Sequence, residues 1–430
     1  MGTALRRCRD AEIAWEERTE IDLAEPDFRR ESRGWGLRVN LEGKLGWAWG
    51  NVDDTPEHIL EAAVHEARNG EQEGILFSHG LPFSGQQPNL EPVNTDPHLH
   101  QLTQLVGRLQ FLIPSLLPDR PVSIRAGLRV QQLCLVTRSG EQISQRVVYQ
   151  LGLHTTNGAP LSAGLVMSRL RSSPAEILCQ LAWRAAHSKK VVDASPGEAP
   201  AVWTEAATAA LLRDLTRTHF DAANFLNTPD LAAPWGEAWL NPRITIQDDG
   251  TLPAGPGTVP FDGEGLARKP VALVQDGVVH HHLADRLNAK ALGVDPPGLA
   301  VREWARPPRP GWSNLAMLGG RSSFGELSRK VGDGILLDHL VPCNAPCEPG
   351  EFCRLAEIAF RLKGGRPAER LAPFLVKARF TDLLGPGLID IGNERSWNHR
   401  CFTPPLATAR VTIEPVGGAQ AEKETPGTWW

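Results

Sequence analysis

The chain has 430 residues, more than one hydrophobic core usually organises, so two domains are expected. Lys and Arg total 45 against 50 Asp and Glu, and this balance gives no long-range attraction for a polyanion, so we expect no nucleic-acid partner. A charged N-terminus and the lack of a long apolar run argue against secretion and membrane association, and seven cysteines fit a reducing compartment, so we expect a cytoplasmic protein.

The first 190 residues are predicted to form an α+β domain, an α/β sandwich-like unit. Strand-type alternation is found at 11–15, 36–39 and 45–49, and the last two form a hairpin across Glu42-Gly43-Lys44. Further strands are predicted at 121–127, 130–137 and 145–153. Helical spacing of apolar residues predicts helices at 55–69, 98–113 and 174–189.

Residues 191–202 are short, small and polar with two prolines, which favours a linker. Residues 203–430 then form a second domain. It begins with a predicted helix at 204–224 and continues with short apolar runs separated by Gly and Pro, which indicates a β-rich, mostly antiparallel domain. These runs are 243–246, 271–274, 334–337, 357–362, 374–378 and 410–413.

The predicted helices 55–69 and 204–224 do not have the residues of a catalytic zinc helix. Such a helix needs two histidines about one turn apart on one face. His65-Glu66 has no second histidine before Gly70 ends its helix, which favours a solvated helix face. The only histidine of helix 204–224 is His219, which continues an apolar stripe and is expected to be a buried or capping residue.

Other candidate ligands and nucleophiles are scattered. His280-His281-His282 cannot bind one ion from one strand, because successive side chains point to opposite faces. His339, Cys343, Cys347 and Cys353 form the densest cluster, but their spacing matches no common zinc knuckle, so a loop with free thiols is favoured over a metal site or a reactive thiol.

Several segments resemble the TldD/PmbA family, also called modulators of DNA gyrase. The central signature is Asp248-Asp249-Gly250-Thr251-Leu252-Pro253, followed by Phe261-Asp262-Gly263-Glu264-Gly265. Arg33–Val39 with Gly43–Ala48 is similar to the N-terminal hairpin of the family, and Arg309–Leu315 to its proline-glycine-serine-asparagine segment. The resemblance singles out Asp249, Phe261, Asp262, Glu264 and Asn314 as signature or peptide-channel positions.

The resemblance implies a two-domain fold in which a catalytic TldD-type subunit pairs with a TldE (PmbA)-type subunit. In the catalytic subunit a His-Glu-x-x-x-His helix and a later cysteine hold zinc, and the glutamate activates water. In this chain the corresponding positions are Arg213, Asp214 and Thr218. Arg stays protonated and Thr is a poor ligand, so we expect no zinc in this chain and zinc in its partner.

The resemblance therefore favours a non-catalytic TldE/PmbA-like subunit that forms a heterodimer with a TldD-like subunit and helps to enclose an unfolded peptide. Two alternatives stay open. The first is a self-sufficient metal- or thiol-dependent hydrolase that uses the Cys343–Cys353 region, or Cys401 with His399. The second is a regulatory binding protein that acts without proteolysis.

Overall fold

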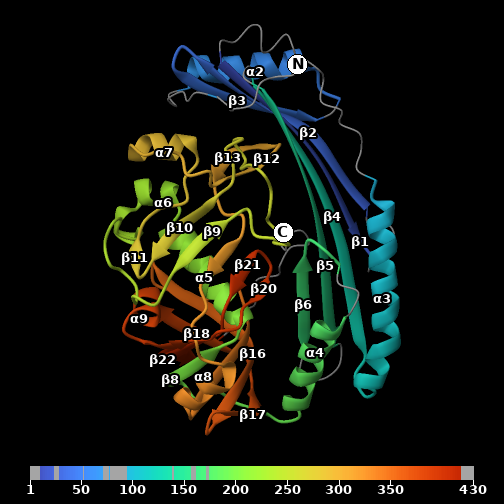
Figure 1. Cartoon of the computed structure of the whole chain (residues 1–430), viewed down its shortest axis with the longest axis vertical. Coiled ribbons are helices and arrows are strands. Elements are labelled where there is room, and N and C mark those ends of the chain that lie inside the picture. The colour runs from blue at the N-terminus through green and yellow to red at the C-terminus, as the bar shows by residue number, and fades with distance from the viewer. Residues whose placement is uncertain are drawn as a thin grey trace.

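The computed structural model describes residues 10–23, 29–51, 53–70, 77, 94–137, 140–155, 161–170 and 174–417. Within these ranges the chain forms an α+β fold with antiparallel sheets, as predicted (Figure 1). The described residues of 10–187 are built on one sheet and residues 191–417 on others, and these two parts are called the first and the second domain. None of the helices in these ranges combines the length and apolar character needed to cross a membrane.

The first domain is built on an antiparallel sheet whose described strands have the order β3-β2-β1-β4-β5-β6. They are β1 (Asp10–Asp22), β2 (Arg29–Leu41), β3 (Lys44–Asn51), β4 (Val122–Thr137), β5 (Glu141–Thr155) and β6 (Ser162–Met167). The predicted hairpin is the β2–β3 pair. The two strands predicted at 121–127 and 130–137 are one strand, β4, because Leu128 and Arg129 continue the ladder with β1 and β5.

Three helices accompany the first sheet: α2 (Pro56–Asn69), α3 (Asp96–Leu116) and α4 (Ala175–His187). Leu102, Leu105 and Leu109 of α3 pack on one face of β4 and β5, as their helical spacing predicts. His65 and Glu66 are exposed on α2, again as predicted. Figure 1 shows α3 along the outer side of the long strands and the second domain on their other side.

The second domain contains two larger sheets and a two-stranded one. The largest has the path β15-β8-β22-β18-β16-β17-β7, with β19 (Leu388–Ile391) paired to β22. Its strands are β7 (Val191–Val192), β8 (Gly197–Trp203), β15 (Gly334–Val341), β16 (Glu351–Lys363), β17 (Arg366–Leu371), β18 (Phe374–Arg379) and β22 (Leu406–Glu414). The segment 191–202 is thus no free linker: it supplies β7 and most of β8, because small buried residues such as Ala201 fit between β15 and β22.

The second sheet of this domain has the order β11-β10-β9-β14-β21-β20. Its strands are β9 (Ile246–Asp249), β10 (Pro270–Gln275), β11 (Val278–Val279), β14 (Leu315–Met317), β20 (Ser396–Asn398) and β21 (Cys401–Thr403), and β12 (Ala300–Glu303) pairs with β13 (Arg306–Pro310) apart from it. The strand predicted at 243–246 therefore begins only at Ile246.

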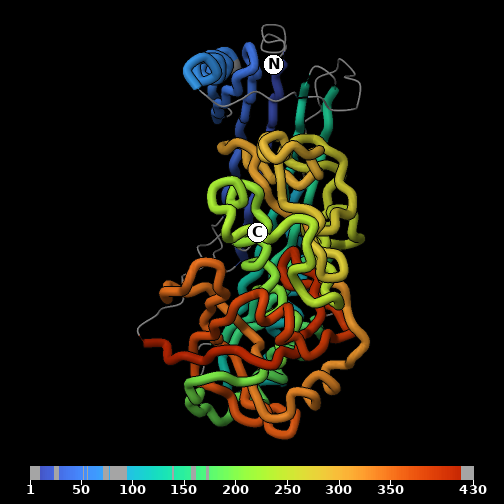
Figure 2. Tube along the Cα trace, turned by 90° about the vertical axis from the view of Figure 1, so that its left-hand side faces the viewer, coloured from blue at the N-terminus to red at the C-terminus, as the bar shows by residue number. Residues whose placement is uncertain are grey.

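The helices of the second domain begin with α5 (Glu205–His219). The others are α6 (Ala222–Asn227), the 3-10 turn η1 (Pro229–Leu231), α7 (Arg286–Leu292), α8 (Phe324–Val331) and α9 (Phe380–Leu384). The helix predicted at 204–224 ends at His219, and Asp221 caps α6 by accepting a 2.9 Å hydrogen bond from Ala223. Helix α5 contacts strands of both larger sheets, and its apolar residues are central to the core. Figure 2 shows the second domain in front of the first sheet, whose α2 end extends beyond it.

Candidate functional site

Helix α5 carries the three positions at which the resemblance places two zinc ligands and the glutamate that activates water. Its N-terminus is fixed by Thr204, whose Oγ1 accepts a 3.3 Å hydrogen bond from the Ala207 N–H. Leu211 and Leu215 are fully buried on its core side. The helix is therefore held rigidly by packing, and its chemistry depends on the remaining side chains.

Asp214, at the position of the zinc-helix glutamate, forms an ion pair. Asp214 accepts hydrogen bonds of 2.7 and 2.6 Å from Nε and Nη2 of Arg354, which lies on β16. A carboxylate in a two-point pair with arginine is poorly placed to activate water. With Arg213 and Thr218 at the histidine positions, the residues present do not fit a zinc ion. No group of three or more His, Cys, Asp or Glu in the described ranges is arranged to hold a metal.

His219, one residue beyond Thr218, is buried in an aromatic environment. Its Nδ1 hydrogen-bonds the Leu231 carbonyl, and its ring contacts Trp239 and Phe380 edge-on. Burial lowers the pKa of His219, so the neutral ring is favoured. This confirms the prediction of a buried or capping histidine, although the helix ends at His219 and not at residue 224.

Cys401 lies near α5, but its surroundings disfavour the reactive thiolate form. It is fully buried on β21, and burial raises the pKa of its thiol to about 11 although the positive charge of Arg213 opposes the shift. A reactive cysteine needs a lowered pKa and access to solvent. The geometry therefore gives no support to a hydrolase that uses Cys401 with His399.

Cys343, just after the end of β15, lies close to Cys353 of β16, since the two thiols are hydrogen-bond partners. Burial first, and then the neighbouring thiols Cys343 and Cys347, raise the pKa of Cys353 to about 12. Weakly acidic thiols are poor nucleophiles and poor metal ligands at neutral pH.

His339 does not join these cysteines. It lies on β15 opposite Ile358 of β16, and its Nε2 is 3.7 Å from Glu357. Burial lowers its pKa to about 4. The four residues singled out by spacing therefore do not converge. The His280–His282 run does not converge either: His280 and His281 are exposed, whereas His282 is buried and hydrogen-bonds the Ala233 carbonyl at 3.0 Å.

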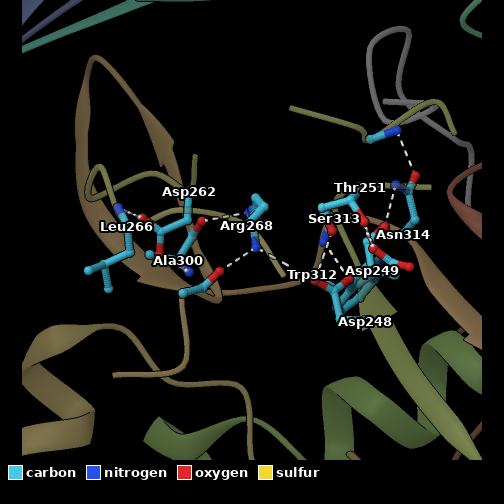
Figure 3. Close-up of polar contacts among 12 residues, drawn as sticks. Asp248, Asp249, Thr251, Asp262, Leu266, Arg268, Ala300, Trp312, Ser313 and Asn314 are labelled. Atoms are coloured by element: carbon cyan, nitrogen blue, oxygen red, sulfur yellow. Dashed lines mark hydrogen bonds and ion pairs between the residues drawn. The ribbon is translucent and has the colours of Figure 1, made fainter. Parts of the chain in front are cut away.

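The signature residues Asp249 and Asn314 shape the backbone of the 250–258 loop. Asp249 accepts hydrogen bonds from the Thr251 N–H and hydroxyl at 2.8 and 2.6 Å. Asn314, fully buried, donates to the Asp249 carbonyl at 2.9 Å and accepts from the Gly257 N–H at 2.8 Å (Figure 3). Their visible role is to hold this loop in place.

Asp262 holds the next loop in the same way. One of its carboxylate oxygens accepts from the N–H groups of Glu264 and Leu266 at 2.8 and 2.9 Å, and the other from Ala300 at 3.0 Å (Figure 3). Burial raises its pKa, whereas Arg268 and the backbone donors oppose the shift. Asp262 thereby fixes the start of β12 beside the signature loop.

Glu264 and Phe261 join the two domains. Glu264 accepts from Arg38 of β2 at 2.7 Å, and Arg38 also donates to both oxygens of Glu12 on β1 at 2.9 and 3.0 Å. Arg302 of the second domain pairs with the same Glu12. Phe261 packs in a cluster with Ala14 and Leu135 of the first sheet. Glu264 is thus a contact between the domains rather than an exposed channel residue.

A cavity of about 270 Å³ lies between the first sheet and the second domain. Strands β1, β4 and β5 supply one wall, and the 257–268 loop, β12 and β13 supply much of the other. Phe261 and Asp262 line it, as does Arg217 at the end of α5. This cavity is the candidate site, because it joins the signature loop, the degenerate helix and the domain junction.

The cavity is rich in arginine, a feature that the sequence analysis did not find. Arg146 of β5 donates to Gln131 at 2.6 Å, and Arg400 donates to the Trp312 carbonyl at 3.1 Å. Burial, and next the charge of Arg400, lower the pKa of Arg146 to about 9, so it is still protonated at neutral pH. In the sequence, these strands show only an alternation of charged with apolar residues, and this pattern usually indicates a solvated face and not a cavity lined by arginine.

Comparison with known proteins agrees with this architecture. The sequence profile of the PmbA/TldA metallopeptidase C-terminal domain matches residues 196–415. A TldD metalloprotease homologue of Haemophilus influenzae is 32% identical over 132 residues, 30% of this chain and 27% of that protein. One from Buchnera aphidicola is 28% identical over 154 residues, 36% of this chain and 30% of that protein. The chain thus spans less than a third of the length of these relatives.

A solved structure gives a likeness over nearly the whole fold. The crystal structure of TldE from Thermococcus kodakarensis superimposes with a TM-score of 0.79 at 19% identity, and the match covers 96% of this chain and 98% of that one. At this identity the likeness concerns the fold.

Proposed function

Because the chain belongs to the PmbA/TldD metallopeptidase family, we propose that it is a non-catalytic, TldE/PmbA-like subunit of a heteromeric zinc metallopeptidase. In this proposal a TldD-like subunit supplies the zinc site, and the two subunits together enclose an unfolded or small peptide. The complex works in the cytoplasm, for which the free thiols of all six described cysteines are suited.

The observation that carries the proposal is which residues helix α5 has at the zinc-site positions. Arg213 and Thr218 replace the two ligands that the family resemblance expects, and Asp214 is committed to Arg354. Zinc chemistry by this helix is therefore disfavoured, whereas the cavity beside it supports a role in holding a ligand. A subunit that binds and encloses substrate accounts for both features.

The test is reconstitution with a TldD-like chain that has an intact His-Glu-x-x-x-His helix. Cleavage of a fluorogenic unfolded peptide is measured for each chain alone and for the mixture, with and without a chelator. We expect chelator-sensitive cleavage that requires both chains. The matched control is a partner whose zinc-helix glutamate is replaced by glutamine, which should abolish cleavage without affecting assembly. Chelator-sensitive cleavage by this chain alone would overturn the proposal.

A further inference from the structure

The cavity between the domains is lined by far more positive than negative side chains. The lining arginines are Arg18, Arg129, Arg146, Arg217, Arg268, Arg302, Arg306, Arg309 and Arg400. The lining acids are Asp221, Asp262 and Glu303. The chain as a whole is acidic, so this local excess of positive charge is a property of the fold and not of the composition.

Part of this charge is balanced within the described residues. Arg18 pairs with Glu16 at 2.8 Å, Arg129 pairs with Glu20, and Arg302 pairs with Glu12. Arg268 donates to the Gly298 and Ala300 carbonyls and lies 3.6 Å from Asp248.

The rest is unbalanced. Arg146 and Arg400, both partly buried, have no ion pair among the residues that the structure describes, and neither do Arg217, Arg306 and Arg309, which are exposed. The positive charge therefore extends from the interior of the cavity to its surroundings.

Buried donors in the cavity also lack acceptors. Arg302 is 8% exposed, and its Nη1 has no hydrogen-bond partner among the described residues. The Nε atoms of Arg18, Arg146 and Arg268 are in the same condition. An unpaired buried donor costs about 1–3 kcal/mol, and more when it is charged. A ligand with several negative oxygens would remove this cost.

We propose that this cavity binds an acidic peptide segment, with Asp or Glu carboxylates paired to the arginines. The inference rests on the proposed function in that it names the kind of peptide that this subunit holds. Planar guanidinium groups pair with carboxylates through two parallel hydrogen bonds. Phe261, Val259 and Trp312 provide apolar surface for the rest of the segment.

The wall formed by β13 favours recognition through side chains. Pro307, Pro308 and Pro310 have no N–H group, so this strand cannot pair fully with a peptide backbone. Arg306 and Arg309 lie on either side of Pro307 and Pro308 and are exposed. Positive charges spread from buried to exposed positions fit carboxylates along a chain better than one compact anion such as phosphate.

The test is fluorescence anisotropy on the full chain without a partner, using a labelled peptide of Glu residues spaced by Gly and Ser. The comparison peptide has Gln in place of each Glu. We expect the Glu peptide to bind about tenfold or more tightly than the Gln peptide, with an affinity that falls as salt is added. Equal binding of the two peptides would overturn the inference.

Variants then locate the binding. Arg146→Gln and Arg400→Gln should each weaken binding of the Glu peptide by about tenfold. Arg29→Gln, which removes an exposed arginine of the same sheet outside the cavity, should leave it unchanged. Because like charges are removed, the melting temperature of the two cavity variants should stay constant or rise. Undiminished binding in both cavity variants would contradict the inference.

Two further measurements keep the outcome clear. If a buried substitution lowers the melting temperature, Arg309→Gln removes a charge at an exposed position of the same cavity, and undiminished binding in that variant counts against the inference.

Tripolyphosphate and inorganic phosphate are titrated as competitors. Tighter binding of either than of the peptide, with the same dependence on Arg146, would assign the cavity to a phosphate ligand instead. Failure of the reconstituted cleavage assay with intact peptide binding would reject only the subunit proposal.

Discussion

Arg38 of the first sheet donates a 2.7 Å hydrogen bond to Glu264, which lies 226 positions later in the chain and in the other domain. Both side chains are almost fully buried, at 3% and 1% exposure. Glu264 also accepts a 2.6 Å hydrogen bond from the Arg286 N–H. The family signature thus contributes directly to the attachment of one domain to the other.

Glu264→Ala should lower the free energy of unfolding by about 3 kcal/mol, because it leaves the buried Arg38 with less compensation for its charge. Urea denaturation measures the change. Glu31→Ala, which removes a partner of the exposed Arg29 on the same sheet, should cost at most about 1 kcal/mol. Similar losses in the two variants would show that the buried pair contributes no more than a surface pair.

The Asp214–Arg354 pair should stabilise the attachment of α5 to β16. Arg354→Met should lower the free energy of unfolding by about 2 kcal/mol, since Asp214 is then left partly buried without its cation. Adding Asp214→Asn should recover part of the loss, which thermal unfolding of the single and double variants measures. Strictly additive effects would mean that the two residues do not interact in solution.

Asp285 should make stability depend on pH. It caps α7 by accepting a 2.8 Å hydrogen bond from the Asn288 N–H, and it accepts a second one of 2.8 Å from the Asn288 side-chain amide. Burial, followed by the charge of Glu264, raises its pKa from 3.8 to about 6. The native state therefore holds this proton more tightly than the unfolded chain, and stability falls as the pH rises from about 4 to about 6.

Asp285→Asn keeps an oxygen acceptor for the cap and removes the charge. We expect the free energy of unfolding at pH 7 to rise by about 1–2 kcal/mol and its decline between pH 4 and 6 to become smaller. Urea unfolding at a series of pH values measures both. An unchanged pH profile would show that Asp285 titrates near its ordinary value in the folded protein.

The described cysteines should differ sharply in reactivity. Cys179 and Cys347 are exposed, whereas Cys134 and Cys401 are fully buried, and burial raises the pKa of Cys134 to about 12 and that of Cys401 to about 11. Iodoacetamide at neutral pH should label the exposed pair in the native protein and the buried pair only after denaturation. Peptide mapping by mass spectrometry measures which cysteines are labelled. Rapid labelling of Cys401 in the native protein would contradict this prediction and support the thiol-hydrolase alternative.

The fold class and most elements could be predicted because hydrophobic periodicity is a local property. The spacing of Leu102, Leu105 and Leu109 predicted a helix at 98–113, and the structure has α3 at Asp96–Leu116 with these three leucines in the core. The strand β8 was missed because its small residues and Pro200 resemble a loop when their neighbours in the sheet are unknown.

The site was harder to predict because its residues meet only when the domains pack together. In β1, Glu12 and Glu16 alternate with the apolar Ile13 and Trp15, a pattern typical of a strand with one wet face. In the structure both glutamates are 0% exposed, since this face packs on the second domain. Similarly, no local pattern relates Arg146 to Arg400, although they line the same cavity.

Because the walls of the cavity belong to different domains, ligand binding and domain packing are thermodynamically linked. A ligand that contacts both Arg146 and Arg400 stabilises the packed arrangement by the same free energy by which packing strengthens its binding. The ligand acts in this respect as a reversible cross-link between the domains. A fully occupied subunit should therefore resist proteolysis at the domain junction better than an empty one.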